Sequence, residues 1–172
     1  MTQRAFVNGD GEFLIVPQQG ALDIQTEFGS LFVQPGEIVV IQRGLRFRVS
    51  LPSDGPAAAR GYILEIWGSR FELPELGPLG ANGLANARDF LSPIASYDKA
   101  RNQPWEIVYK MGGKFFSSSQ NHSPFDVVAW HGNYVCLTQP NTYLPIKLTD
   151  NKKKGPVQIR PHQVRQRRVY LC

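Results

Sequence analysis

The chain has 172 residues, of which 42% are hydrophobic and 19% are charged. These values are typical of a globular protein and exclude a disordered one, and the length suits one domain rather than two large ones. No apolar run approaches the roughly 20 residues that a membrane helix needs, and we expect no secretory leader. Two cysteines, Cys136 and Cys172, make neither a disulfide framework nor a zinc motif, so we expect a cytoplasmic protein.

The positive charge is concentrated at one end of the chain. Residues 1–134 hold 11 Lys+Arg and 13 Asp+Glu, a net charge of −2, whereas residues 135–172 hold 8 Lys+Arg and only Asp150, a net charge of +7. Nucleic-acid binding through this tail is one interpretation, because basic segments bind phosphates by releasing counterions. The tail lacks interleaved aromatic residues and any known nucleic-acid module, which favours a disordered, solvated segment instead.

Short apolar runs alternate with turn signals every 8–12 residues, and this pattern predicts a mainly β protein. After the turn at residues 8–11, we expect strands at Phe13–Val16, Ala21–Glu27, Ser30–Val33, Glu37–Gln42, Arg46–Ser50 and Gly61–Trp67. The predicted core residues of this part are Leu14, Val16, Leu22, Ile24, Val39, Ile41, Phe47, Ile63 and Leu64. We assign no inward and outward faces to Gly61–Trp67, since both could be buried.

The second half begins with a different composition. Residues 76–95 are rich in Gly and Asn but have neither the lysine of a P-loop nor GxGxxG spacing, which argues against a phosphate site. Glu106–Met111 and Lys114–Ser117 then read as paired strands around the Gly112-Gly113 turn. Val127–Trp130 reads as a buried strand that ends at His131, and His122 reads as a surface residue.

The stretch EFGSLFVQPGEIVVIQRGLRFRV, residues 27–49, resembles the second conserved motif of the cupin superfamily. This resemblance implies a double-stranded β-helix, or jelly roll. Metal-binding cupins usually have a histidine ligand at the position that matches Arg46. A guanidinium has no lone pair for a metal, so we expect this first cupin unit to be structural.

Several longer stretches are similar to the homogentisate 1,2-dioxygenase family, which has two cupin units. They are DGEFLIVPQQG, TEFGSLFVQPGEIVVIQRG, RGYILEIWG, FELPELGPLGANGLANARDF and SPFDVVAWHGNY, and they cover about residues 6–134. The resemblance implies the β-rich part of the first cupin unit at residues 1–75. It implies a connector and the start of the second, catalytic unit at residues 76–134, followed by a non-homologous, disordered basic tail at 135–172.

The family cleaves the ring of homogentisate with O₂ to give maleylacetoacetate, in tyrosine and phenylalanine catabolism. Its Fe(II) is held by two His and one Glu, a facial triad that leaves positions open for substrate and O₂. Those ligands follow WHGNY in an H-x5-E stretch and a later His, and this sequence has neither, so we expect the chain to be inactive alone. The resemblance carries over one catalytic residue, His131, as the base for the ring hydroxyl, and no metal ligand.

Two alternatives stay open. The chain could be a metal-free cupin-like binding or scaffolding protein that pairs with longer subunits, because the resemblance implies oligomers. The abrupt end of the resemblance after Tyr134 also suggests translation past an exon end, since Val135-Cys136 codons are compatible with a splice donor. Genomic DNA at these codons would test that hypothesis.

Overall fold

The structure is a computed structural model that describes residues 3–71, 90–91, 93, 96–99, 102–126 and 146–148. Strands are the only regular secondary structure in these ranges. None of the described residues forms a helix that is long and apolar enough to cross a membrane. The described part is therefore mainly β, as the sequence predicts.

Eleven strands are present in this described part. They are β1 (Gln3–Asn8), β2 (Gly11–Gln19), β3 (Leu22–Thr26), β4 (Gly29–Val33), β5 (Ile38–Ile41), β6 (Arg46–Ser50), β7 (Arg60–Trp67), β8 (Phe90–Leu91), β9 (Trp105–Met111), β10 (Lys114–Gln120) and β11 (Ile146–Leu148). All expected strands within the described ranges are present, and β6 has the predicted bounds. β1, β8 and β11 were not predicted from the sequence, and Val127–Trp130 lies outside the described residues.

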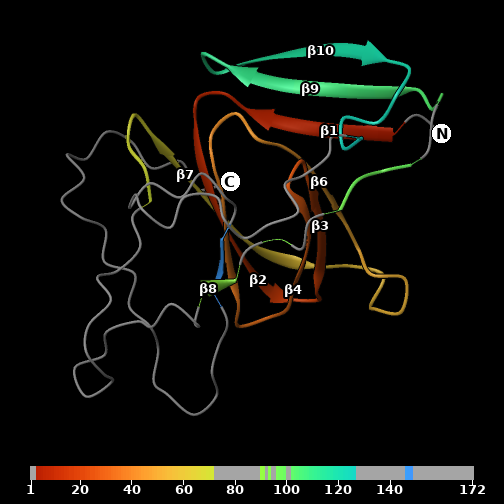
Figure 1. The fold of residues 1–172 in the computed structure, drawn as a ribbon. Coiled ribbons are helices and arrows are strands. Elements are labelled where there is room, and N and C mark those ends of the chain that lie inside the picture. The colour runs from red at the N-terminus through yellow and green to blue at the C-terminus, as the bar shows by residue number, and fades with distance from the viewer. Residues whose placement is uncertain are drawn as a thin grey trace.

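The first sheet has six strands in the order β10-β9-β1-β6-β3-β4. Its one parallel pair joins the start of the chain to its second half, because Gln3 on β1 lies opposite Trp105 on β9. Figure 1 shows β1, β9 and β10 side by side. The β9–β10 hairpin turns at Gly112 and Gly113, whose φ angles of 59° and 71° favour glycine. Strands assigned to the second predicted unit thus share a sheet with strands of the first.

The second sheet has five strands in the order β7-β2-β5-β11-β8, and all its pairs are antiparallel. β11 lies between β5 and β8, where Lys147 is opposite both Val39 and Leu91. From the sequence we expected a disordered tail at residues 135–172, and the structure has Ile146–Leu148 of this segment in a strand. Alternation of apolar residues over only three positions is too short to reveal a strand. The remainder of that segment lies outside the described residues.

The main core lies between the two sheets. Its buried residues are Ile15, Ile24, Leu31, Val33, Val39, Ile41, Leu45 and Phe47, which come from both sheets. Four predicted core residues (Ile24, Val39, Ile41 and Phe47) are confirmed as buried.

Other predicted core positions differ from the structure. On β2 the inward residues are Phe13 and Ile15, whereas Leu14 and Val16 on the opposite face are only partly buried. Ile63 is 45% exposed because β7 is an edge strand. Leu22 and Leu64 are partly buried.

A polar bridge joins the two sheets at one end of the core. Lys110 on β9 forms an ion pair with Glu65 on β7, and both side chains are largely buried. Asn8 Nδ2 donates a hydrogen bond of 2.6 Å to Glu65 Oε1. The Lys110 ammonium also lies 5.0 Å from the centre of the Trp67 ring, a favourable cation–π distance. This bridge fixes β7 against β1 and β9.

Candidate functional site

The candidate catalytic residue, His131, lies outside the described residues, together with the rest of WHGNY. The last described residue before His131 is Asp126, five positions earlier in the sequence. The structure describes residues 121–126, the segment that precedes His131 in the sequence. It also shows how this segment is held on the six-stranded sheet. The geometry of the candidate site is therefore the geometry of this anchor.

A small buried cluster anchors that segment on the face of the six-stranded sheet that points away from the main core. Trp105 on β9, Ala5 on β1 and Phe125 are all buried there. The rings of Trp105 and Phe125 meet edge to face at 5.4 Å, an arrangement that aromatic pairs favour. Apolar burial thus attaches the chain just before the candidate catalytic stretch.

Hydrogen bonds fix the same segment more precisely. The buried Ser123 hydroxyl donates to Asp98 Oδ2 at 2.6 Å, and the other carboxylate oxygen accepts from Gln25 Nε2 at 2.8 Å. The Asp98 N–H donates to the Phe125 carbonyl at 2.8 Å. The Phe125 N–H donates to Ser123 Oγ at 3.2 Å. Asp98 therefore ties β3 and residues 123–125 together through one carboxylate.

Asp98 and Ser123 were not identified from the sequence. Ser123 carries a weak signal, since Ser-Pro dipeptides favour turns. Asp98 carries none, because its role depends on residues 73 positions away in the chain.

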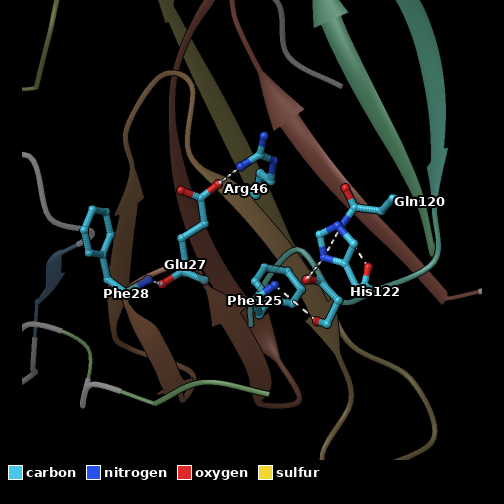
Figure 2. Close-up of polar contacts among 8 residues, drawn as sticks. Glu27, Phe28, Arg46, Gln120, His122 and Phe125 are labelled. Carbon is cyan, nitrogen blue, oxygen red and sulfur yellow. Dashed lines mark hydrogen bonds and ion pairs between the residues drawn. The ribbon is translucent and has the colours of Figure 1, made fainter. Parts of the chain in front are cut away.

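His122 lies at the surface, as predicted. Its Nδ1 is 3.1 Å from Asp126 Oδ2 and 3.2 Å from the Ser123 carbonyl oxygen. Figure 2 shows this ring beside Gln120. The Gln120 side-chain amide donates a hydrogen bond of 2.8 Å to the His122 backbone carbonyl. These contacts close a surface turn.

Arg46, which we predicted to match the position of a cupin metal ligand, forms an ion pair with Glu27. Its Nη1 lies 2.9 Å from Glu27 Oε1. Figure 2 shows the two side chains pointing toward each other. Burial alone lowers the pKa of Arg46, but the Glu27 carboxylate and the Tyr109 hydroxyl outweigh it, so the pKa lies above its usual value. The guanidinium stays charged and can only donate hydrogen bonds.

One buried carboxylate was not identified from the sequence. Glu12 on β2 is 7% exposed, on the face of the five-stranded sheet away from the core. Burial raises its pKa, although a 2.8 Å hydrogen bond from the Phe71 N–H and the charges of Arg70 and Arg43 act in the opposite direction. Perturbed carboxylates often mark functional sites, but here the carboxylate accepts a hydrogen bond from the backbone just after β7.

The described residues do not fit an iron site. A facial triad needs two histidines and a carboxylate. In the part of the chain that the structure describes, no group of three or more His, Cys, Asp or Glu could hold a metal ion. His122 and Asp126 form a single His–carboxylate pair.

The fold and this site define a mainly β protein of two packed sheets, with a buried anchor before a histidine-containing motif. The family described as "Homogentisate 1,2-dioxygenase N-terminal" matches residues 1–140. The chain belongs to that family, as the resemblance predicted. The match also includes His131, and it extends past the predicted limits of residues 6–134.

Curated relatives agree with this assignment. Proteins named homogentisate 1,2-dioxygenase are similar to the chain: 60% identical over 134 residues in Dictyostelium discoideum and 62% over 131 residues in Oryza sativa subsp. japonica. The Homo sapiens relative is 57% identical over 137 residues. These matches cover 78%, 76% and 78% of this chain but only 30%, 27% and 30% of the relatives. The chain thus spans about 30% of the length of these relatives.

Proposed function

We propose that the chain supplies the N-terminal-family part of a homogentisate 1,2-dioxygenase. The proposed reaction is Fe(II)-dependent opening of the homogentisate ring by O₂ to give maleylacetoacetate. The observation that carries this proposal is the 57–62% identity to relatives named for that activity. Identity at this level, spread over the anchor and the WHGNY motif, favours a retained role in the same enzyme rather than a reused fold.

The same proposal includes a cupin-like jelly roll. Two packed sheets and the placement of the cupin-like motif on β4, β5 and β6 support it. Arg46 stands on β6 at the position where a metal-binding cupin has histidine, and its ion pair with Glu27 takes the place of a ligand set. We therefore propose that the first cupin unit has a structural role.

His131 is the proposed base for a ring hydroxyl of homogentisate. Imidazole is the side chain that ordinarily titrates near neutrality, which suits it to accept a phenolic proton. The anchor at Asp98, Ser123 and Phe125 supports the proposal, because it holds the chain five residues before His131 in one position. In catalysis, a misplacement of about 1 Å can lower the rate by about 100-fold.

Iron supplies the activation of O₂ in the proposed reaction. The described residues do not fit it, and the sequence has no H-x5-E stretch. We therefore expect no oxygen uptake by this chain alone with Fe(II) and homogentisate. Further ligands would have to come from sequence that the longer relatives contain.

A chimera tests the proposal directly. Residues 3–134 would replace the matching segment of the Dictyostelium discoideum relative, to which the chain is 60% identical. We expect the chimera to take up oxygen with homogentisate, and we expect His131→Ala within it to lower kcat by about 100-fold or more.

The matched control is His122→Asn in the same chimera, since His122 is a surface residue and the asparagine amide can still donate a hydrogen bond to Asp126, so kcat should stay unchanged. A chimera that folds and binds iron but takes up no oxygen would contradict the proposed function. Equal kcat values for the two histidine variants would contradict the role of His131.

A second candidate is a metal-free cupin-like binding or scaffolding protein, which the Arg46–Glu27 ion pair favours. It predicts that the chain associates with itself or with a full-length relative. Sedimentation of the chain, alone and mixed with the relative, would detect that association. An active chimera together with a strictly monomeric chain would exclude this candidate.

A further inference from the structure

One strand of the five-stranded sheet comes from sequence beyond the family match. The match covers residues 1–140, whereas β11 is Ile146–Leu148. β11 nevertheless lies between β5 and β8, two strands that the match includes. In Figure 1, β11 is the blue strand beside β8. A segment that the family match leaves out thus has an interior place in a sheet that the matched residues build.

Two strands depend on β11 for a partner. β5 pairs with β2 along one edge and with β11 along the other. Val39 and Ile41 on β5 are almost fully buried in the main core, so this second edge belongs to a central strand. Within the described residues, β8 pairs with β11 alone. Unpaired backbone groups along a strand edge are a template for another strand, and β11 covers such an edge on both β5 and β8.

The pairing is short and is made through the backbone. β11 runs antiparallel to both neighbours, and three of its residues have partners on β5 and two on β8. When an extended segment adds to a sheet, main-chain hydrogen bonds give the affinity. Pairing of this kind places few demands on sequence, so a segment outside the family match can provide it. Because β11 has only three residues, it has few such bonds to lose when it leaves the sheet.

We propose that the position between β5 and β8 is a strand-binding site, and that β11 occupies it as an exchangeable donor strand. The tail completes the sheet within its own chain, and the same tail segment from a second copy can take its place. The occupant that fits is an extended segment that pairs antiparallel with both β5 and β8, as β11 does. Part of the basic tail thus has a role in completing the fold.

A labelled peptide tests the exchange. The peptide has the sequence of residues 142–151, and fluorescence anisotropy follows its binding to the full 172-residue chain. In the Lys147→Pro chain, proline removes a backbone donor from β11, so we expect saturable binding of one peptide per chain. The unmodified chain should bind the peptide about 10-fold more weakly or less, because its own β11 competes at the high effective concentration of an attached segment.

Two matched controls test whether strand pairing causes the binding. The Lys147→Thr chain keeps the N–H and should bind the peptide as weakly as the unmodified chain does. A peptide that carries Lys147→Pro should bind the Lys147→Pro chain about 10-fold more weakly than the unmodified peptide, since it lacks the same donor. If circular dichroism shows that the Lys147→Pro chain is unfolded, the expected result is refolding when the unmodified peptide is added.

A disulfide cross-link tests the register. Lys147 and Leu91 lie opposite each other, and Cα atoms in such antiparallel pairs are about 4.5–5.5 Å apart, which a disulfide can bridge. With Cys136 and Cys172 replaced by serine, Leu91→Cys in the Lys147→Pro chain should cross-link to a peptide with Lys147→Cys. Tyr97→Cys is the control and should cross-link far less, because Tyr97 is similarly exposed, at 46% against 45% for Leu91, but lies outside the strands.

Four results would overturn the proposal. They are equal peptide affinities for the Lys147→Pro and unmodified chains, equal affinities of the two peptides, equal cross-linking at positions 91 and 97, and an unfolded Lys147→Pro chain that does not refold with the peptide. None of these results depends on oxygen uptake, so they leave the proposed dioxygenase function untouched.

Discussion

Two glutamates, Glu65 and Glu12, lie on opposite faces of the five-stranded sheet, and their carboxylates have different partners. Glu65 faces the other sheet, where Lys110 and Asn8 meet its carboxylate. Glu12 faces away from the core and receives one backbone hydrogen bond, from Phe71. Since a buried charge is costly unless it is paired, removing a partner should matter most at Glu65.

Lys110→Met should therefore lower the free energy of unfolding by about 3 kcal/mol, because it leaves the Glu65 carboxylate buried without its cation. Adding Glu65→Gln should recover at least half of that loss. The glutamine still offers an oxygen to Asn8 but carries no charge. Urea unfolding of the single and double variants provides the measurement, and a double variant no more stable than Lys110→Met would contradict this account.

Glu12 should make stability depend on pH. Its pKa is raised above the ordinary 4.5, with burial as the main cause, so the folded chain holds the proton more tightly than the unfolded chain. The stability linked to this proton is fully present below pH 4.5 and is lost as pH rises through the raised pKa.

Glu12→Gln mimics the protonated form and keeps an oxygen for the Phe71 N–H. Compared with this variant, the unmodified chain should lose stability steadily as pH rises from 4 to 8. Urea unfolding across that range measures the difference. A difference that stays constant with pH would show that the Glu12 carboxyl does not titrate differently on folding.

For individual residues, the sequence predicts burial correctly only where one face of a strand is clearly apolar. Ile24 was predicted correctly because Asp23 and Gln25 flank it. In Phe13–Val16 all four residues are apolar, so periodicity does not choose between Leu14 and Ile15. The choice is made by the opposite sheet, which covers Ile15.

Close approach of strands is visible at β2 and β7. A Cβ atom placed on Gly11 would lie 2.2 Å from the Ile66 carbonyl oxygen. Backbone cannot move away as easily as the end of a side chain, so only glycine fits there. This contact explains part of the NGDG sequence that was predicted only as a turn.

Gly11→Ala should lower the free energy of unfolding by about 1–3 kcal/mol, the usual cost of overpacking. The control is Gly55→Ala, where the nearest atom would be 3.5 Å away. This control should change stability by no more than about 0.5 kcal/mol. Thermal unfolding of both variants makes the comparison, and equal effects would refute the close contact.

Strand positions were predictable, but strand partners were not. Turn residues bound β2 to β7, so their ranges follow from local sequence. β1 was missed because residues 3–8 precede the first turn signal and have no alternating pattern of their own. Its parallel pairing with β9 depends on the whole sheet and has no local sequence signal.

The chain's later residues complete the five-stranded sheet. β11 is an interior strand, and Lys147 pairs with Val39 on one side and Leu91 on the other. A proline there removes a backbone donor that the sheet uses. The consequence extends to both neighbours, β5 and β8.

Lys147→Pro should accordingly lower the free energy of unfolding by about 2 kcal/mol, through lost hydrogen bonds on an interior strand. Lys147→Thr is the control, because it removes the charge yet keeps the N–H and favours strands. Guanidinium unfolding distinguishes them. Equal stabilities for the two variants would mean that β11 contributes nothing to the sheet.

For the candidate site, the sequence supplied the motif and the structure supplied its support. His131 is identifiable because WHGNY is a specific pattern, and this remains a prediction. Asp98 and Ser123 were not identifiable, since their hydrogen bonds connect β3, residues 96–99 and residues 123–125. Contacts of this kind form only when the six-stranded sheet exists.

The parallel pairing of β1 with β9 also limits how fast the chain can fold. Gln3 meets Trp105, so closing this pair brings together residues about 100 positions apart before any contact repays the lost entropy. Proteins with many such distant pairings fold in milliseconds to seconds. During synthesis, β1 leaves the ribosome long before β9, and until then the backbone groups on one edge of β1 have no strand partner. At roughly 5–20 residues per second, that wait lasts several seconds, during which the apolar side chain of Phe6 depends on β2 and β6 for cover.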